Sequence, residues 1–267
     1  MLPTPPKTSL RLLNALGFIG TLAVNALANA LPINGKTTGE ISDQYPNLFT
    51  PAGLTFSVWG LIYLLLTAFC VYQAKDRLGA KKEVLPFVSS IGYFFLVSCG
   101  ANAAWILAWH YEQVALSLVL MLVLFTSLLG IYLRLDVGRR AVSWPEKFFV
   151  HVPFSVYLAW ITVATIANAT AWLVDRGWRG GASEAVWAMG MVGVAALITL
   201  FLLFQRRDVF YGLVVLWALA GILTKRLDAS GQMVTNLVAV TGACFLLVGI
   251  ATVLTAFRRV EKVRTVA

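Results

Sequence analysis

Three groups of aromatic and amide side chains recur at helical spacing along apolar stretches of the sequence. Within each group the members lie three, four or seven residues apart, which places them on one side of a helix. Flat rings offer stacking surfaces and amides offer hydrogen bonds, a combination that suits a large, planar, mostly apolar ligand. Ordinary aromatic packing between helices would give the same pattern, so both interpretations remain open. The groups are Phe56, Trp59 and Tyr63; Asn102, Trp105 and Trp109; and Trp160, Ala164, Asn168 and Trp172.

Side chains that could perform catalysis are scarce. The two histidines are His110, which ends an apolar stretch two residues before Glu112, and His151, which begins another. A histidine–glutamate pair can transfer protons or bind a metal, but at the end of an apolar helix an ordinary interfacial cap is more typical. The three cysteines lie far apart inside apolar stretches. We therefore expect no catalytic residues, no metal site and no enzymatic activity.

The elements that position these side chains are long apolar helices. Hydrophobic residues make up 59% of the 267 residues, charged residues only 12%, and the mean hydropathy is +0.80, whereas soluble domains carry about 25% charged residues. Eight segments are long enough to cross ~30 Å of hydrocarbon at ~1.5 Å per residue. The sequence predicts an all-α integral membrane protein with eight spans. These lie near residues 10–30, 51–73, 86–109, 114–134, 148–173, 184–205, 209–224 and 233–257.

The first segment has a second interpretation. Lys7 and Arg11, the apolar stretch that follows and Ala28-Asn29-Ala30 also fit a signal peptide with a cleavage site. Asn14 and Asn25 make a poor signal core. Such amides are more typical of a bundle helix that forms hydrogen bonds with its neighbours.

The distribution of basic residues predicts the topology. The net charge is +9, but Lys and Arg lie at the ends of apolar segments and not in one stripe, which argues against nucleic acid as a partner. With eight spans, one side of the membrane receives 16 Lys and Arg residues and the other side 5. The positive-inside rule then predicts cytoplasmic termini and an external loop at 31–50. As the location we expect a bacterial inner membrane.

The middle third of every predicted span lacks Asp, Glu, Lys and Arg. Ionisable groups inside membrane helices usually mark ion pathways or counter-ions. This pattern argues against an ion-coupled transporter with a buried carboxylate. It also argues against a retinal protein, which needs a lysine in mid-membrane.

The aromatic groups resemble the pattern of the translocator protein family, also called TspO or tryptophan-rich sensory proteins. The resemblance covers roughly residues 10–181 and implies a five-helix domain at 1–181. The last three spans have no counterpart in five-helix members of the family, so we expect residues 182–267 to form a C-terminal extension of three helices. The matching blocks are Pro51-Ala52-Gly53 with Phe56-Ser57-Val58-Trp59-Gly60-Leu61-Ile62-Tyr63, then Asn102-Ala103-Ala104-Trp105, and Tyr157-Leu158-Ala159-Trp160 with Asn168 and Trp172.

In this family the loop between the first two helices covers a pocket in the bundle, and that pocket is associated with porphyrins and related tetrapyrroles. The chain departs from the family pattern at Ala52, where the family has proline, and in a lid richer in Gly, Thr and acidic residues. The sterol-recognition pattern is absent after the fifth span. The resemblance implies a pocket wall of Trp59, Tyr63, Asn102, Trp105, Trp160, Ala164 and Asn168, and a lid at 31–50 with apolar contacts from Tyr45, Pro46 and Phe49.

The residues and the resemblance together favour a membrane binding or sensory protein for a porphyrin, haem or other planar apolar ligand, with no required cofactor. Its expected partners are the lipid bilayer and that ligand, without nucleic acid. The alternative is a transporter or permease for such a ligand, in which the last three spans form a gating or dimerisation unit, so a homodimer remains open. A third hypothesis, an enzyme that degrades porphyrin with light and oxygen, lacks an acid/base motif.

Overall fold

The computed structural model describes residues 7–31, 33–74, 85–178, 183–227 and 232–257, and within these ranges every regular element is a helix. The described prolines lie in loops or in the first turn of a helix, and the helices themselves are made mainly of Leu, Val, Ala, Gly and aromatic residues. In chain order the elements are α1 (Lys7–Ala30), η1 (Ile33–Gly35), α2 (Thr38–Asp43), η2 (Gly53–Ser57), α3 (Val58–Gln73), α5 (Pro86–Ile91), α6 (Phe94–His110), α7 (Val114–Arg134), α8 (Trp144–Glu146), η3 (Lys147–His151), α9 (Val152–Asp175), α10 (Glu184–Arg206), α11 (Val209–Leu227) and α12 (Gln232–Phe257).

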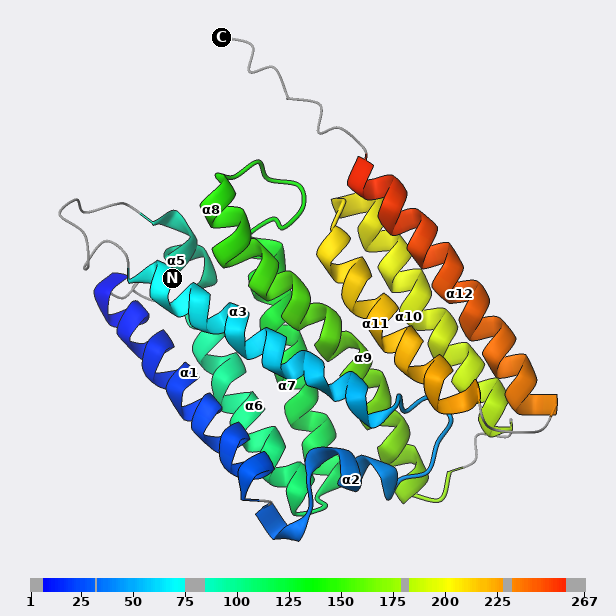
Figure 1. Ribbon diagram of the computed structural model, residues 1–267. Helices are drawn as coiled ribbons and strands as arrows, with labels where there is room; N and C mark the ends of the chain where they lie inside the picture. The colour runs from blue at the N-terminus through cyan, green and yellow to red at the C-terminus, as the bar shows by residue number, and fades with distance from the viewer. Residues whose placement is uncertain (1–6, 32, 75–84, 179–182, 228–231, 258–267) are drawn as a thin grey trace.

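Seven helical stretches are long and apolar enough to cross a membrane, and α6 is a shorter apolar helix of 17 residues. The prediction of an all-α membrane protein is confirmed. In Figure 1, α1 begins and α12 ends at the same end of the bundle, as an even number of crossings requires. The N-terminal segment is a helix of the bundle, and its Asn14 donates to Gln73 of α3 at 3.2 Å.

The prediction of one continuous helix over 86–109 is wrong. The chain forms α5, turns at Gly92 and starts α6 at Phe94. Gly92 adopts φ 55° and ψ −135°, a conformation open to glycine because it has no Cβ. At ~1.5 Å per residue, α6 alone extends about 26 Å, somewhat less than the hydrocarbon thickness of ~30 Å.

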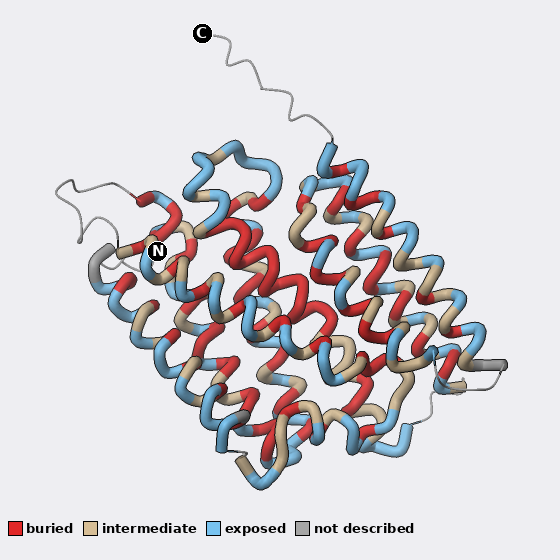
Figure 2. The backbone as a smooth tube through the Cα atoms, in the orientation of Figure 1, coloured by how far each residue is buried: buried red, intermediate tan, exposed pale blue. Residues whose placement is uncertain are grey.

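Five helices form a closed ring in which each contacts the next, in the order α1, α3, α9, α7 and α6. The remaining three, α10, α11 and α12, pack on one another beside this ring, with α11 against α9 (Figure 1). Helix α9 therefore has neighbours on every side, and each residue from 150 to 163 is buried (Figure 2). The predicted domain boundary between 181 and 182 lies outside the described residues.

A buried carboxylate that the sequence reasoning missed joins the turn between α10 and α11 to the ring. Asp208 lies in the turn between α10 and α11 and is only 4% exposed. Its carboxylate accepts hydrogen bonds from Ser155 of α9 at 2.7 Å and from Tyr132 of α7 at 2.8 Å. Burial raises the pKa of Asp208, and these hydrogen bonds oppose the shift by favouring the charged form. The turn is thereby tied to two helices of the ring.

A second junction lies at the other end of α11, where two backbones touch. The carbonyl of Gly221 accepts a hydrogen bond from the amide of Ala52 at 3.0 Å, and Trp217 donates to the carbonyl of Thr55 at 2.9 Å. A Cβ atom on Gly221 would collide with the side chain of Thr55. Glycine at this position therefore lets α11 lie directly against the start of α3.

We predict that Gly221→Ala destabilises the protein, because the added methyl group must push α11 away from Thr55. Overpacking of this kind costs about 1–3 kcal/mol. The measurement is thermal unfolding in detergent followed by circular dichroism. Gly190→Ala is the matched control, since Gly190 lies in α10 with open space around the added Cβ, and it should be neutral or slightly stabilising. Equal shifts for the two variants would contradict the close contact.

Candidate ligand-binding site

Helices α1 and α3 diverge along their length and leave a wedge-shaped space between them. They meet at one end, where Asn14 bonds Gln73, and separate toward the other end, where α2 lies between them (Figure 1). The separation leaves a cavity of about 640 Å³. That volume falls in the range of ~300–1,000 Å³ usual for small-molecule sites.

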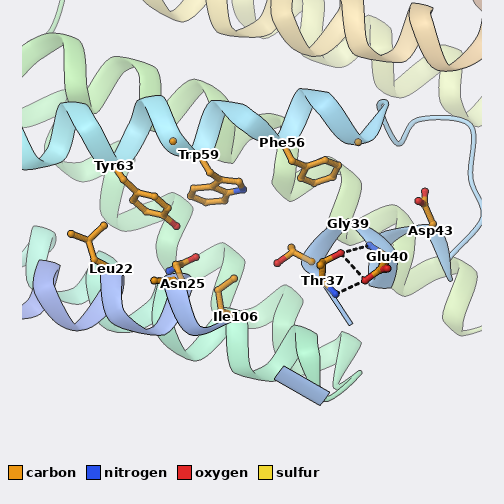
Figure 3. A pocket seen from close by; sticks show the side chains of 14 residues that line it. Leu22, Asn25, Thr37, Gly39, Glu40, Asp43, Phe56, Trp59, Tyr63 and Ile106 are labelled. Carbon is orange, nitrogen blue, oxygen red and sulfur yellow. Dashed lines mark hydrogen bonds between the residues drawn. The ribbon is translucent and has the colours of Figure 1, made fainter. Parts of the chain in front are cut away.

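Four parts of the chain line this cavity, as Figure 3 shows. One wall is aromatic, a second is the polar segment of α2, and α1 and α6 supply mainly apolar surface and one amide. The lining residues are Leu22, Asn25 and Ala26 of α1; Thr37, Thr38, Gly39, Glu40 and Asp43 in and before α2; Gly53, Phe56, Trp59, Gly60 and Tyr63 of η2 and α3; and Ile106 of α6.

The aromatic wall consists of Phe56, Trp59 and Tyr63, which project from one side of η2 and α3 toward α1 (Figure 3). Their spacing of three and four residues brings them to the same side of the helix. Trp59 and Tyr63 stack with ring centres 5.6 Å apart and planes 20° from parallel. The wall therefore presents flat stacking surface to the cavity.

Trp59 also fills the centre of the ring. It stacks on Trp105 of α6 at 6.1 Å and meets Tyr157 and Trp160 of α9 edge-on at 6.0 and 6.2 Å. Behind this cluster only about 40 Å³ remains, little more than the ~30 Å³ share of one water molecule. In this structure the bundle interior is thus filled by its own rings, and the open volume lies between α1 and α3.

The sequence-predicted pocket residues are accordingly divided. Tyr63 lines the large cavity, and Trp59 lines both spaces. Asn102, in the middle of α6, lines neither, although its side chain lies close to the hydroxyl of Tyr63. Trp105, Trp160, Ala164 and Asn168 line the small interior space. The indole ring of Trp59 separates the two groups.

Asn102 is fully buried and joins three helices. Its carbonyl oxygen accepts from Asn25 of α1 at 2.7 Å, and its amide nitrogen donates to the hydroxyl of Tyr157 of α9 at 2.9 Å. Asn168 similarly bonds Ser117 of α7 at 3.0 Å. Both amides thus hold helices of the ring together through polar atoms that are already paired.

The loop 31–50 lies across one end of the ring, as a lid would, but its residues contribute differently than predicted. Tyr45 packs on Trp109 at 5.7 Å and is 9% exposed. Pro46 and Phe49 border a separate hollow beside Trp178. The lid residues at the large cavity instead come from 37–43, the Gly-, Thr- and acid-rich stretch that departs from the family pattern.

Two sets of contacts hold this lid in place. On one side, the ring nitrogens of His110 contact the hydroxyl of Thr38 at 3.1 Å and the carbonyl of Ile33 at 3.0 Å. On the other, Lys225 of α11 pairs with Asp43 at 2.7 Å and Arg226 donates to the carbonyl of Asn47 at 2.7 Å. His110 is thus a lid contact, and Glu112 pairs with Lys36 instead of with His110.

No group of three or more His, Cys, Asp or Glu side chains is arranged to hold a metal ion within the described ranges. The polar chemistry at the cavity is limited to hydroxyls, amides and the carboxylates of Glu40 and Asp43. Such a set can orient a ligand through hydrogen bonds and charge, and the aromatic wall can stack on it.

These features define an all-α membrane protein with a five-helix ring and an aromatic-walled cavity between α1 and α3. The family model for TSPO-like protein matches residues 11–254, so the chain belongs to the TSPO-like protein family. The match runs through α10 and α11 into α12, and it draws no line between a five-helix core and an extension. No curated protein and no solved structure matches the chain.

We predict that Asn102→Ala lowers stability more than Tyr157→Phe. The first change removes bonds to both α1 and α9 and should cost about 1–3 kcal/mol, because partners inside the bundle are left unsatisfied. The second removes one hydroxyl and should cost about 0.5–1.5 kcal/mol. Thermal unfolding in one detergent ranks the two. The reverse order would mean that Asn102 does not link the three helices.

Proposed function

We propose that the protein is a membrane binding or sensory protein that holds a planar, mostly apolar ligand of the tetrapyrrole type in the cavity between α1 and α3. The observation that carries the proposal is the 640 Å³ cavity with its aromatic wall of Phe56, Trp59 and Tyr63. Stacking on such a wall is worth about 0.5–1.5 kcal/mol per ring pair beyond the burial of apolar area. Three aligned rings therefore favour a ligand with a broad flat face.

The lid would control access to this cavity. The 37–43 stretch covers the end at which α1 and α3 separate. It is held by the side chains of Trp109 and His110 of α6 and by Lys225 of α11, and Arg226 holds the adjoining Asn47, so opening requires these contacts to break. In this proposal the C-terminal helices act as the support of the lid.

A permease for the same ligand is the alternative. Transport requires the site to open to both sides of the membrane in turn. The cavity lies at the α2 end of α1 and α3, and neither Asn14 nor Gln73, which close the other end, is among its lining residues. This arrangement supports binding over transport, and flux of ligand across liposomes containing the purified protein tests the choice.

For the orientation, we propose that the lid faces the outside and the termini face the cytoplasm. Arg134, Arg139, Arg140, Lys147, Arg206 and Arg207 lie at the loops opposite the lid. Lys36, Arg176, Lys225 and Arg226 lie at the lid end. The basic residues of 75–84 and 258–267, which the sequence argument also uses, lie outside the described residues. The lid end carries fewer Lys and Arg residues than the opposite end, which supports an external lid.

We predict that filling the large cavity abolishes binding, whereas filling the small interior space does not. Gly60→Leu adds a side chain into the large cavity, where the Cβ meets open space, and should weaken protoporphyrin binding at least tenfold by steric exclusion. Ala164→Leu adds the same bulk to the interior space and should change the affinity less than threefold. Saturable quenching of tryptophan fluorescence measures both.

The reverse pattern, loss with Ala164→Leu and retention with Gly60→Leu, would place the ligand inside the ring in an opened form of the bundle. Quenching that does not saturate in the unmodified protein would reject the binding function. Both variants must first unfold at the same temperature as the unmodified protein, so that a loss of binding does not reflect a loss of structure. Trp59 borders both spaces, so its fluorescence reports on a ligand in either one.

We predict that Arg226→Met speeds dissociation of a bound porphyrin about fivefold. The guanidinium donates to the carbonyls of Asn47 and Leu48 at 2.7 and 3.3 Å, and such bonds at a partly exposed site contribute about 1 kcal/mol. Stopped-flow displacement measures the rate. Arg139→Met is the control, since Arg139 makes two comparable bonds to Gln205 of α10, away from the lid. Equal rates in both variants would reject α11 as the support of the lid.

A further inference from the structure

We propose that the cavity selects ligands whose polar end is cationic, and that it discriminates against carboxylate-bearing porphyrins. This inference rests on the proposed function, because it specifies the charge of the ligand held there. Its basis is the pairing of an aromatic wall with carboxylates at the lid edge of the same cavity.

The charged side chains that line the cavity are all acidic. Glu40 and Asp43 are among the lining residues, and no Lys, Arg or His is. The nearby cations Lys36 and Lys225 are each engaged in an ion pair, with Glu112 at 2.6 Å and Asp43 at 2.7 Å. Among the described residues Glu40 has no cationic partner. The cavity edge therefore carries one uncompensated negative charge.

Glu40 is held as a fixed anion by the start of α2. Its carboxylate accepts hydrogen bonds from the backbone amide and the hydroxyl of Thr37, at 2.7 and 2.9 Å. Those two bonds lower the pKa of Glu40, so the group is ionised at neutral pH. Figure 3 shows this pair at the end of the cavity beside Phe56. A charge in a fixed place can select among ligands, whereas a freely moving side chain does so less well.

The opposite end of the cavity carries a neutral polar group. The hydroxyl oxygen of Tyr63 is buried close to Asn102. Its neighbour Asn102 is engaged with Asn25 and Tyr157. In Figure 3 this hydroxyl points toward α1, beside Asn25. A ligand in the cavity therefore meets a neutral polar end near Tyr63 and Asn25, negative charge at the other end, and stacking surface between them.

The physical consequence is a preference of measurable size. In water, a unit charge on the ligand about 4 Å from a carboxylate changes the affinity of the ligand about fivefold. A positive charge raises the affinity and a negative charge lowers it. A cation near Phe56 and Trp59 gains further from the negative faces of the rings. An anion at the same place meets repulsion from Glu40 and no compensating cation on the wall.

The experiment uses three probes that share one ring system and differ in charge. Protoporphyrin with two free carboxylates, its neutral dimethyl ester and its bis-amide bearing two quaternary ammonium groups share the same planar body. Binding of each is measured by tryptophan quenching in nanodiscs of zwitterionic phosphatidylcholine. The tested variants are Glu40→Gln, which removes the charge and keeps a side chain suited to the same capping position, and Asp43→Asn.

Affinity of the variant relative to the unmodified protein is the quantity compared, since it cancels the partition of each probe into lipid. For Glu40→Gln we expect about a fivefold loss for the dication, a gain of similar size for the dianion and less than a twofold change for the ester. Asp43→Asn should act in the same direction, because it also leaves Lys225 without its partner. High salt should reduce these differences. Glu184→Gln, an exposed carboxylate outside this cavity, should change none of the three.

Equal changes for all three probes, or a dianion that binds as tightly as the dication in the unmodified protein, would overturn the inference while leaving the binding function intact. Absence of saturable quenching with every probe would instead reject the binding function itself. If Glu40→Gln unfolds at a lower temperature than the unmodified protein, Asp43→Asn decides the question alone.

Discussion

The hydrogen-bond chain from Asn25 through Asn102 to Tyr157 is the constraint on which the ring depends. It joins α1, α6 and α9 at a depth where no solvent can replace a lost partner. Because α1 is fixed to α6 by this chain and to α3 by the bond of Asn14 to Gln73, α3 can separate from α1 toward the lid end. The cavity is the space left by that separation, and its existence follows from where the amides pair.

Trp59 determines which part of that space stays open. Its indole packs against rings of α6 and α9 and so fills the middle of the ring. The same indole exposes its other surface to the cavity beside Phe56 and Tyr63. One side chain therefore serves as the packing centre of the bundle and as part of the candidate binding surface. Movement of α3 would change both at once.

The C-terminal helices are linked to the candidate site through α11. At one end Asp208 ties the α10–α11 turn to Tyr132 and Ser155 of the ring. At the other end the helix contacts Ala52 and η2 at Gly221, and the lid through Arg226. A family match that continues to residue 254 fits this physical continuity, since α11 contacts both the 31–50 loop and η2.

The sequence by itself determined the class of protein and the helices. Long runs with few charges predict spans because a bilayer excludes unpaired charge and free backbone groups, and the 3.6-residue period placed Phe56, Trp59 and Tyr63 on one side of α3. The periodicity of a sequence shows which residues share one side of a helix. It does not show which helix that side packs against, or how the helix is tilted. Only the tertiary structure decided that Asn102 bonds two other helices and that Glu40 borders the cavity. It also decided that Asp208 and Gly221 dock α11, because each of these contacts joins segments distant in the sequence.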